Sequence, residues 1–175
     1  MRVCDHGIYF VVQGTPDRLA FVSARIALIG HSAAGKSSCI EKLGFSRELA
    51  DMDRALGVRV APPVSEFRDW LSAKDTPAVI ALSIHPPMLD AYYKAARELG
   101  VLLVYLFKSR ERIKEHVKLQ QPNGDFRPEV DQSVTVHTHA HFDNIFREAK
   151  DLIIDCSDKD TAAVAIGVKR ILESR

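Results

Sequence analysis

The sequence predicts an α/β protein whose parallel β-sheet of about five strands is covered by helices on both faces. Short apolar runs alternate along the chain with stretches in which apolar residues recur at helical spacing. The strongest run, 101–107 (VLLVYLF), is continuous rather than alternating, as in a strand buried on both faces. This repetition of strand and helix is typical of a parallel sheet.

The elements expected in the first half of the chain follow from apolar runs and helix stop signals. The apolar run 25–29 predicts the first strand, and the helix expected over 36–43 stops at Gly44. The second strand is expected within 48–52, although the apolar content of this segment is low. Apolar residues at helical spacing predict a helix over 64–73.

The second half continues the alternation. The run 78–82 predicts a buried strand, and two prolines at 86–87 suit the first turn of a helix that Gly100 ends. The strand over 101–107 follows directly. The remaining expected elements are a charged helix over 110–119, a lid over about 119–141, a helix over 142–150, a strand over 152–154 and a final helix that Asp160 or Thr161 caps.

The length and composition fit one globular domain. The 175 residues are 46% hydrophobic and 27% charged, which excludes a disordered tail, a collagen-like fibre and a membrane bundle. Lys plus Arg (24) nearly balance Asp plus Glu (23), so no overall basic excess favours a nucleic-acid partner. Residues 1–23 lie outside the alternation, and we expect them to add a strand or hairpin to a domain over 24–175.

Cysteine usage and hydropathy predict a cytoplasmic protein. Cys4, Cys39 and Cys156 are odd in number and widely spaced, which favours reduced thiols over a disulfide framework. The apolar patch at 8–12 is too short for a signal-peptide core, and no window approaches the roughly 20 apolar residues of a membrane span. We therefore expect no membrane partner, and the oligomeric state stays open.

The segment after the first expected strand matches the phosphate-binding motif G-x-x-x-x-G-K-[ST], with a strand before it and a helix after it. In that context backbone N–H groups surround a phosphate, the lysine reaches the β- and γ-phosphates, and the serine hydroxyl ligates Mg²⁺. The alternative is a glycine-containing turn with an unrelated lysine. The expected nucleotide-binding residues are Gly30, His31, Ser32, Ala33, Ala34, Gly35, Lys36, Ser37 and Ser38.

Two carboxylates follow where the second strand is expected to end. Asp51 and Asp53 are two residues apart, so on an extended backbone both would project toward the mouth of the phosphate loop. One carboxylate can hold Mg²⁺ while the other accepts a hydrogen bond, and then the proton, from the attacking hydroxyl. The alternative is a solvated acidic turn that leads into a helix at Asp53.

From about Arg25 to the C-terminus the sequence resembles the shikimate kinase family. The resemblance rests on the phosphate loop and the D-x-D pair, together with Phe67-Arg68, Phe126-Arg127-Pro128 and the segment 155–165. It implies a P-loop kinase fold that uses ATP and Mg²⁺ and that carries a lid.

The resemblance also implies roles for individual residues. Lys36 would contact the phosphates, Asp51 would serve the metal ion, and Asp53 would contact the acceptor hydroxyl. Arg68 would bind a carboxylate of the acceptor; the alternative is a surface arginine paired with a nearby acid. Arg127 in the lid would reach the transferring phosphates, where a mobile cation can neutralise developing charge.

The acceptor side departs from the family pattern. The family has three consecutive glycines after its third strand, whereas residues 81–87 contain none, so side chains occupy space that the family leaves to its substrate. Ser83 and His85 are therefore the expected specificity residues. The family's second acceptor-binding arginine aligns with Phe142, and the segment 53–68 is shorter than usual. An acceptor other than shikimate follows from these departures.

The sequence therefore predicts ATP- and Mg²⁺-dependent phosphoryl transfer to a hydroxyl of a small metabolite, with Lys36, Asp53 and Arg127 as catalytic residues. One alternative is an ATP-binding regulatory module without transferase activity. Another is a nucleoside or nucleotide kinase, which needs arginines at a second phosphate site; Arg54 and Arg59, with Arg68, lie in the corresponding region.

A histidine pattern stands apart from this scheme. His137, His139 and His141 spell H-x-H-x-H, which on an extended backbone could bind a transition metal. No fourth ligand is evident nearby in the sequence. The alternative is that the three histidines simply end the lid.

Overall fold

The computed structural model contains a mixed β-sheet whose parallel part has four strands within the described residues. These strands are β3 (Ile26–Ile29), β4 (Val79–Ala81), β5 (Leu102–Phe107) and β6 (Leu152–Asp155). The predicted α/β class with a parallel sheet is thus confirmed. The structure describes residues 2–3, 9–10, 25–30, 34–57, 62–82, 89–109, 111–113, 115 and 152–173.

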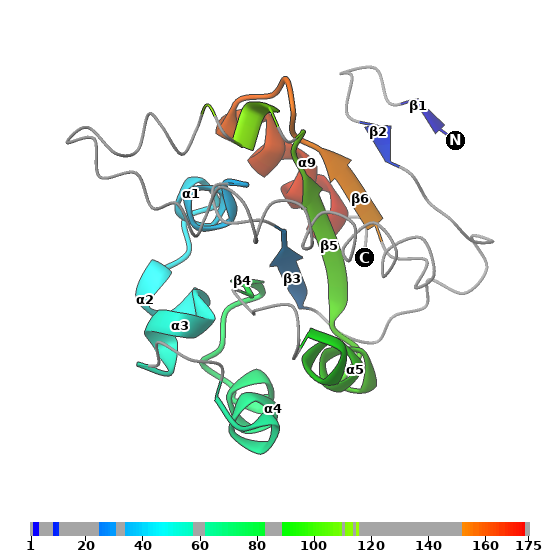
Figure 1. The fold of residues 1–175 in the computed structure, drawn as a ribbon. Coiled ribbons are helices and arrows are strands. Elements are labelled where there is room, and N and C mark those ends of the chain that lie inside the picture. Colours follow the sequence, from blue (N-terminus) through cyan, green and yellow to red (C-terminus); the bar gives the residue numbers. More distant parts are fainter. Residues whose placement is uncertain are drawn as a thin grey trace.

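The spatial order of the strands is β1-β2-β6-β5-β3-β4. β1 (Arg2–Val3) and β2 (Tyr9–Phe10) are antiparallel to each other, and Phe10 of β2 pairs with Ile154 of β6 (Figure 1). The two short strands therefore lie at the β6 edge of the sheet. The division of the chain at residue 24 into an extension and a domain stays a prediction.

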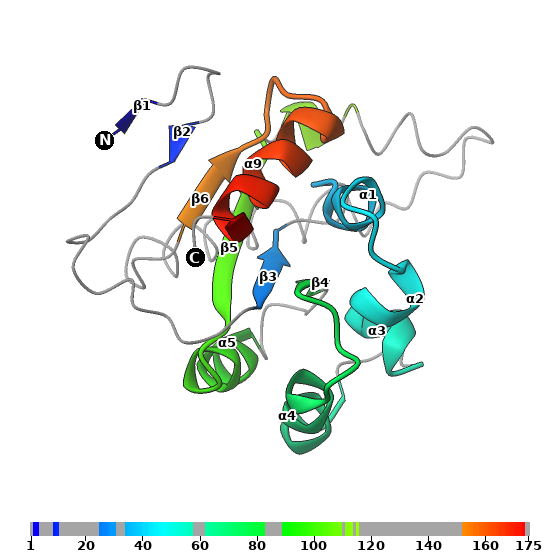
Figure 2. The ribbon, with the colours of Figure 1, turned by 180° about the vertical axis from the view of Figure 1, so that it is seen from behind.

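One face of the sheet packs against α1 (Lys36–Lys42) and α9 (Thr161–Glu173). Ile26 and Leu28 of β3 belong to this cluster, and α9 lies across β5 and β6 (Figure 2). Burial of these strand side chains stabilises the folded chain by about 25 cal/mol for each Å² of apolar surface that is removed from water. This face fixes α1, and with it the end of the phosphate-binding motif, against the centre of the sheet.

The opposite face packs against α4 (Val64–Ser72) and α5 (Leu89–Glu98). Ala27 and Ile29, the alternate residues of β3, belong to this second cluster, in which Tyr92 is also fully buried. All four residues of β3 are 0% exposed, so β3 is covered on both faces. The prediction of helices on both faces is therefore confirmed.

Helix boundaries agree closely with the predictions. α1 ends just before a turn in which Gly44 has a φ of 81°, the left-handed conformation expected at a helix stop. α4 ends within one residue of its predicted end. The N–H of Ala163 donates to the Asp160 carboxylate at 2.7 Å, so Asp160 is the residue that caps α9.

The expectation of a second strand within 48–52 is wrong. α2 (Arg47–Ala50) and α3 (Met52–Ala55) occupy the segment, and only Asp51 between them forms a β-bridge, to Ala81 of β4. Too few apolar side chains are available for a strand buried on both faces, whereas the residues of both short helices are mostly good helix formers.

The expected lid over 119–141 and the helix over 142–150 lie outside the described residues. The histidines of the H-x-H-x-H pattern lie there too. Within the described ranges, none of the helices has the length and apolar character needed to cross a membrane.

Arg25, the residue before β3, is hydrogen-bonded to the end of α4. Its guanidinium donates one hydrogen bond to the carbonyl of Leu71 and another, of 2.6 Å, to the carbonyl of Ala73. The last carbonyls of a helix have no partner within the helix, and the helix dipole makes them attractive to a cation. Arg25 therefore gives the carbonyl of Leu71 a charged donor and adds a second donor to the carbonyl of Ala73, which also accepts the N–H of Thr76.

Replacement of Arg25 by methionine keeps the apolar stem of the side chain but removes both hydrogen bonds. We expect Arg25→Met to lower the free energy of unfolding by about 2 kcal/mol, because two helix-end carbonyls lose a charged donor. Urea denaturation followed by circular dichroism measures this change.

The matched control is Lys169→Met, since Lys169 is 64% exposed and contacts Glu173 at 3.7 Å within α9. We expect the control to change stability by less than about 0.5 kcal/mol. Equal effects of the two substitutions would contradict the anchoring role of Arg25.

Candidate functional site

The carboxyl ends of the parallel strands define the edge at which a ligand is expected. β3 has β4 on one side and β5 on the other, so the chain changes direction across the sheet at β3. In open α/β sheets, ligands bind beyond the carboxyl ends of the strands at such a switch point. Gly30, the first residue of the phosphate-binding motif, follows β3 directly at this point.

Both glycines of the motif have positive φ angles. Gly30 has a φ of 146°, and a Cβ atom there would lie 2.7 Å from the carbonyl oxygen of Leu106 in β5. Gly35 has a φ of 96° and directly precedes α1. Side chains would thus be strained at both positions and would clash with β5 at the first. Residues 31–33 of the motif, His31, Ser32 and Ala33, lie outside the described residues, so their predicted contacts stay predictions.

Lys36, the first residue of α1, is a buried cation. Its Nζ donates a 2.8 Å hydrogen bond to the carbonyl of Gly30, and only 7% of the residue is exposed. Burial lowers the pKa of Lys36 from 10.5 to about 8, while the charges of Asp51 and Asp53 act in the opposite direction. The ammonium group therefore lies at the carboxyl end of β3 within the influence of both carboxylates.

Ser37 and Asp51 are joined by a hydrogen bond. The Ser37 hydroxyl donates to Oδ2 of Asp51 at 2.8 Å, and Asp51 is 6% exposed. A hydroxyl and a carboxylate are hard oxygen donors, and Mg²⁺ prefers such ligands. Their spacing and chemistry fit the predicted role of Ser37 and Asp51 as metal ligands, although that role itself stays a prediction.

The backbone of the acidic pair differs from the expectation. Asp51 is extended, with φ −89° and ψ 115°, but Asp53 lies in the first turn of α3 and is exposed. The pair therefore forms an acidic turn that leads into a helix, as in the alternative considered from the sequence. Both carboxylates nevertheless influence the pKa of Lys36, so the structure brings the three residues into one site.

Of the other predicted site residues, some are described by the structure and others lie outside the described residues. Arg68 on α4 forms an ion pair with Glu98 at the end of α5, as in the alternative of a surface arginine paired with an acid. Ala34 is buried two residues before α1, and Ser38, the third residue of α1, is exposed. Ser83, His85 and Arg127 lie outside the described residues, and their roles stay predictions.

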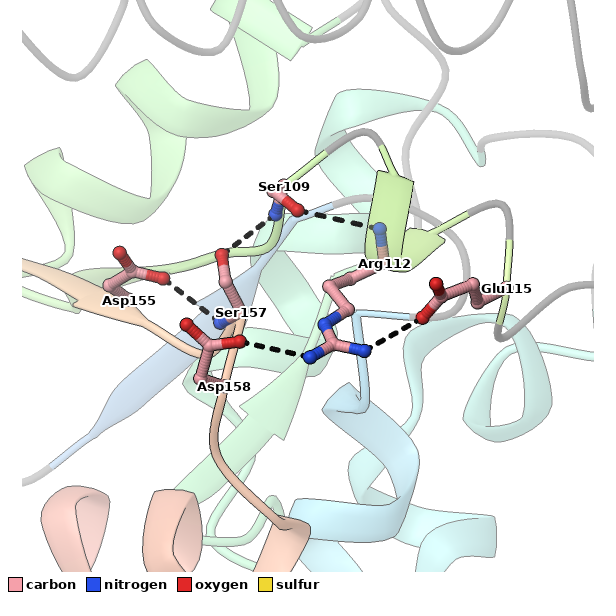
Figure 3. A network of polar contacts seen from close by, with 6 residues as sticks. All are labelled: Ser109, Arg112, Glu115, Asp155, Ser157 and Asp158. Atoms are coloured by element: carbon pink, nitrogen blue, oxygen red, sulfur yellow. Dashed lines mark hydrogen bonds and ion pairs between the residues drawn. The ribbon is translucent and has the colours of Figure 1, made fainter.

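A network of polar contacts connects the segments that follow β5 and β6 (Figure 3). The N–H of Ser109 donates to the hydroxyl of Ser157 at 2.9 Å, and Arg112 contacts Asp158 at 3.2 Å. Sequence reasoning missed this link, because its partners are far apart along the chain. The network comprises Ser109, Arg112, Glu115, Asp155, Ser157 and Asp158.

Two cysteine thiols are buried within the described part of the chain. Cys39 of α1 and Cys156 after β6 are buried and free, and burial raises the pKa of each to about 12. Both are therefore protonated near neutral pH and are weak nucleophiles and poor metal ligands. Among the described residues, no group of three or more His, Cys, Asp or Glu side chains could hold a metal ion.

A solved structure of a gluconokinase from Sinorhizobium meliloti 1021 is similar to this chain. The two share 17% sequence identity and superpose with a TM-score of 0.54, over 86% of this chain and 94% of that one. The chain therefore shares the fold of this gluconokinase. No protein-family model matches the sequence, and no curated protein matches it.

The shared fold agrees with the resemblance found in the sequence, but at this identity the likeness extends to the fold alone. Within this fold, Gly30 directly follows the central strand β3, and Lys36 and Ser37 are the first two residues of the following helix, α1. The match to the phosphate-binding motif and the observed strand–turn–helix context therefore support each other.

The buried charge of Lys36 makes a prediction about pH. The unfolded chain holds this proton up to about pH 10.5, whereas the folded chain releases it near pH 8. Stability linked to Lys36 therefore rises with pH between these values. We expect Lys36→Met to gain up to about 3 kcal/mol over the original chain below pH 8, and this gain to shrink by pH 10.5.

Urea denaturation at a series of pH values from 7 to 11 measures this difference. Lys169→Met is the matched control for loss of an exposed lysine. A stability difference between Lys36→Met and the original chain that stays constant across this range would contradict the buried-cation interpretation.

Proposed function

We propose that the chain is an ATP- and Mg²⁺-dependent kinase that transfers a phosphoryl group to a hydroxyl of a small metabolite. The single observation that carries this proposal is the position of Lys36. A buried cation, next to the Ser37–Asp51 pair, lies at the carboxyl end of the central strand of a P-loop kinase fold. The fold neighbour, a gluconokinase, supports the same class of activity.

The nucleotide half of the proposal rests on the turn from Gly30 to Ser38. Its backbone N–H groups would surround the β-phosphate, and Lys36 would exchange the carbonyl of Gly30 for phosphate oxygens. An anionic partner favours the charged form of a buried lysine, so binding relieves the burial that lowers the pKa of Lys36.

Ser37 and Asp51 would hold the metal ion beside the phosphates. When bound there, Mg²⁺ neutralises charge on the phosphate chain. Asp51 is already positioned for this by the 2.8 Å hydrogen bond from Ser37. Ser37 would then present its oxygen lone pair to the metal site in place of donating its proton to Asp51.

The acceptor half rests mainly on Asp53. This carboxylate is exposed in the first turn of α3 and influences Lys36, so an acceptor hydroxyl beside it would lie near the transferring phosphate. Asp53 would orient the hydroxyl and accept its proton as the new O–P bond forms. Arg127 from the lid, and Ser83, His85 and Arg68 on the acceptor side, complete the proposed set.

The acceptor class follows from two resemblances. The shikimate kinase motifs and the gluconokinase neighbour both favour a hydroxylated carboxylic acid. Arg68, the proposed partner of the acceptor carboxylate, pairs with Glu98 in the present structure. A carboxylate substrate would have to replace Glu98 as the partner of Arg68.

Acceptor-dependent release of ADP from Mg·ATP tests the proposal. The panel is gluconate, other sugar acids, shikimate, neutral sugars and nucleosides. We expect at least one hydroxylated acid to accelerate ADP release. We also expect Asp53→Asn to lower the accelerated rate at least about 100-fold, because a proton acceptor is lost from the transition state.

Asp75→Asn is the matched control, since Asp75 is an exposed carboxylate in the turn before β4, away from Lys36. It should leave the accelerated rate within about twofold of the original, as expected for a carboxylate with no part in the transition state. ATP binding without acceleration by any acceptor would overturn the kinase proposal in favour of the ATP-binding regulatory module.

The regulatory module remains the second candidate because the acceptor-side glycines of the family are missing from 81–87. A nucleotide kinase is less well supported. Of the arginines considered for a second phosphate site, Arg54 pairs with Glu48 and Arg68 pairs with Glu98. Both guanidinium groups already have carboxylate partners.

A further inference from the structure

Asp51 joins four elements of the structure through different atoms. Its backbone N–H donates to the carbonyl of Arg47 in α2 at 3.0 Å, and its backbone forms the β-bridge to Ala81 of β4. Its carboxylate accepts the hydrogen bond from Ser37 at 2.8 Å. Its carbonyl oxygen accepts the N–H groups of two residues of α3. Asp51 therefore connects the metal-binding pair directly to the helix that carries Asp53.

The carbonyl of Asp51 accepts the hydrogen bonds that start α3. The N–H groups of Arg54 and Ala55 donate to it at 3.0 and 2.8 Å, which closes the first turn of a four-residue helix, and the N–H of Leu56 continues the helix with a 3.0 Å bond to the carbonyl of Met52. A helix of this length has little stability of its own. Met52 anchors one side of α3 because its side chain is fully buried in the cluster under α4 and α5. The orientation of Asp51 therefore largely sets the position of the first turn of α3, which carries Asp53.

We propose that Asp51 is a positioning residue that couples the metal–nucleotide site to Asp53, so that the hydrogen bonds that start α3 open less often when Mg·nucleotide is bound. This inference rests on the proposed function and adds a communication route within it. The acceptor-side carboxylate would be held more firmly once the phosphate donor and its metal are present.

Electrostatics explains why the coupling requires the metal. A nucleotide without Mg²⁺ places unneutralised phosphate charge near the Asp51 carboxylate, and like charges at close range repel. This repulsion strains the segment that begins α3. With Mg²⁺ present, the Asp51 carboxylate would be attracted to the metal ion instead of being repelled by the phosphates. The Asp51 backbone is then fixed, and the two hydrogen bonds from α3 to its carbonyl open less often.

Amide hydrogen exchange, followed by NMR on the full chain, measures this opening. We expect the amides of Arg54 and Ala55 to exchange about fivefold or more slowly with saturating ADP and Mg²⁺ than with saturating ADP and EDTA. The amide of Thr76, which donates to the carbonyl of Ala73 in a turn before β4, is the control and should exchange at the same rate in both conditions.

Asp51→Asn separates the charge from the fold. The asparagine oxygen still accepts the hydrogen bond from Ser37, but the side chain carries no charge for the metal. In this variant we expect the Mg²⁺-dependent slowing at Arg54 and Ala55 to fall below about twofold at saturating ADP, since only the charge responds to the metal. Asp75→Asn is the matched control and should keep the full slowing.

The outcomes separate the inference from the proposed function. Binding of Mg·ADP without slower exchange at Arg54 and Ala55 would overturn the inference and leave the kinase proposal intact. Full slowing in Asp51→Asn would also overturn it. Absence of ADP binding in both conditions would instead overturn the proposed function, and the inference with it.

Discussion

The burial of a positive charge on Lys36 is the constraint around which this end of the molecule is organised. The ammonium group is bonded to the carbonyl of Gly30 and is influenced by two carboxylates, and its pKa still falls to about 8 because burial dominates. A charge held at this free-energy cost is typical of a functional site, and under the proposed function an incoming polyphosphate would relieve the same cost.

The rest of the fold maintains this arrangement. Separate clusters of apolar side chains cover the two faces of β3, so the strand can end at Gly30 while its own side chains stay buried. Gly30 passes so close to the carbonyl of Leu106 that no side chain fits, and the chain turns there into α1. In the first turn of α1, the Ser37 hydroxyl donates a hydrogen bond to Asp51, and Asp51 directly precedes α3. Lys36, the hydrogen-bonded pair Ser37–Asp51 and Asp53 are therefore connected through short segments of backbone.

The sequence predicted the features that depend on local patterns. Continuous apolar runs located the parallel strands, and glycine located the end of α1. The phosphate-binding role of the motif from Gly30 to Ser37 stays a prediction, although the strand before it and the helix after it are present as expected. The second strand was mispredicted because Asp51 forms its bridge alone, a tertiary contact with Ala81 that no local pattern reveals. The carboxylate partners of Arg68 and Arg112, which are Glu98 and Asp158, could not be identified for the same reason, since each pair joins residues distant in sequence.

Calorimetric titration of the full chain with ATP, ADP, tripolyphosphate and adenosine, each with Mg²⁺, measures whether the segment from Gly30 to Ser38 binds a polyphosphate. We expect ATP and ADP to bind with dissociation constants between about 1 μM and 1 mM, in the usual range for enzyme substrates. Tripolyphosphate should compete with them, because Lys36 and the loop would recognise phosphate, whereas adenosine should bind far more weakly. No detectable binding of any purine triphosphate, with Mg²⁺ present and the chain folded, would contradict the proposed nucleotide site.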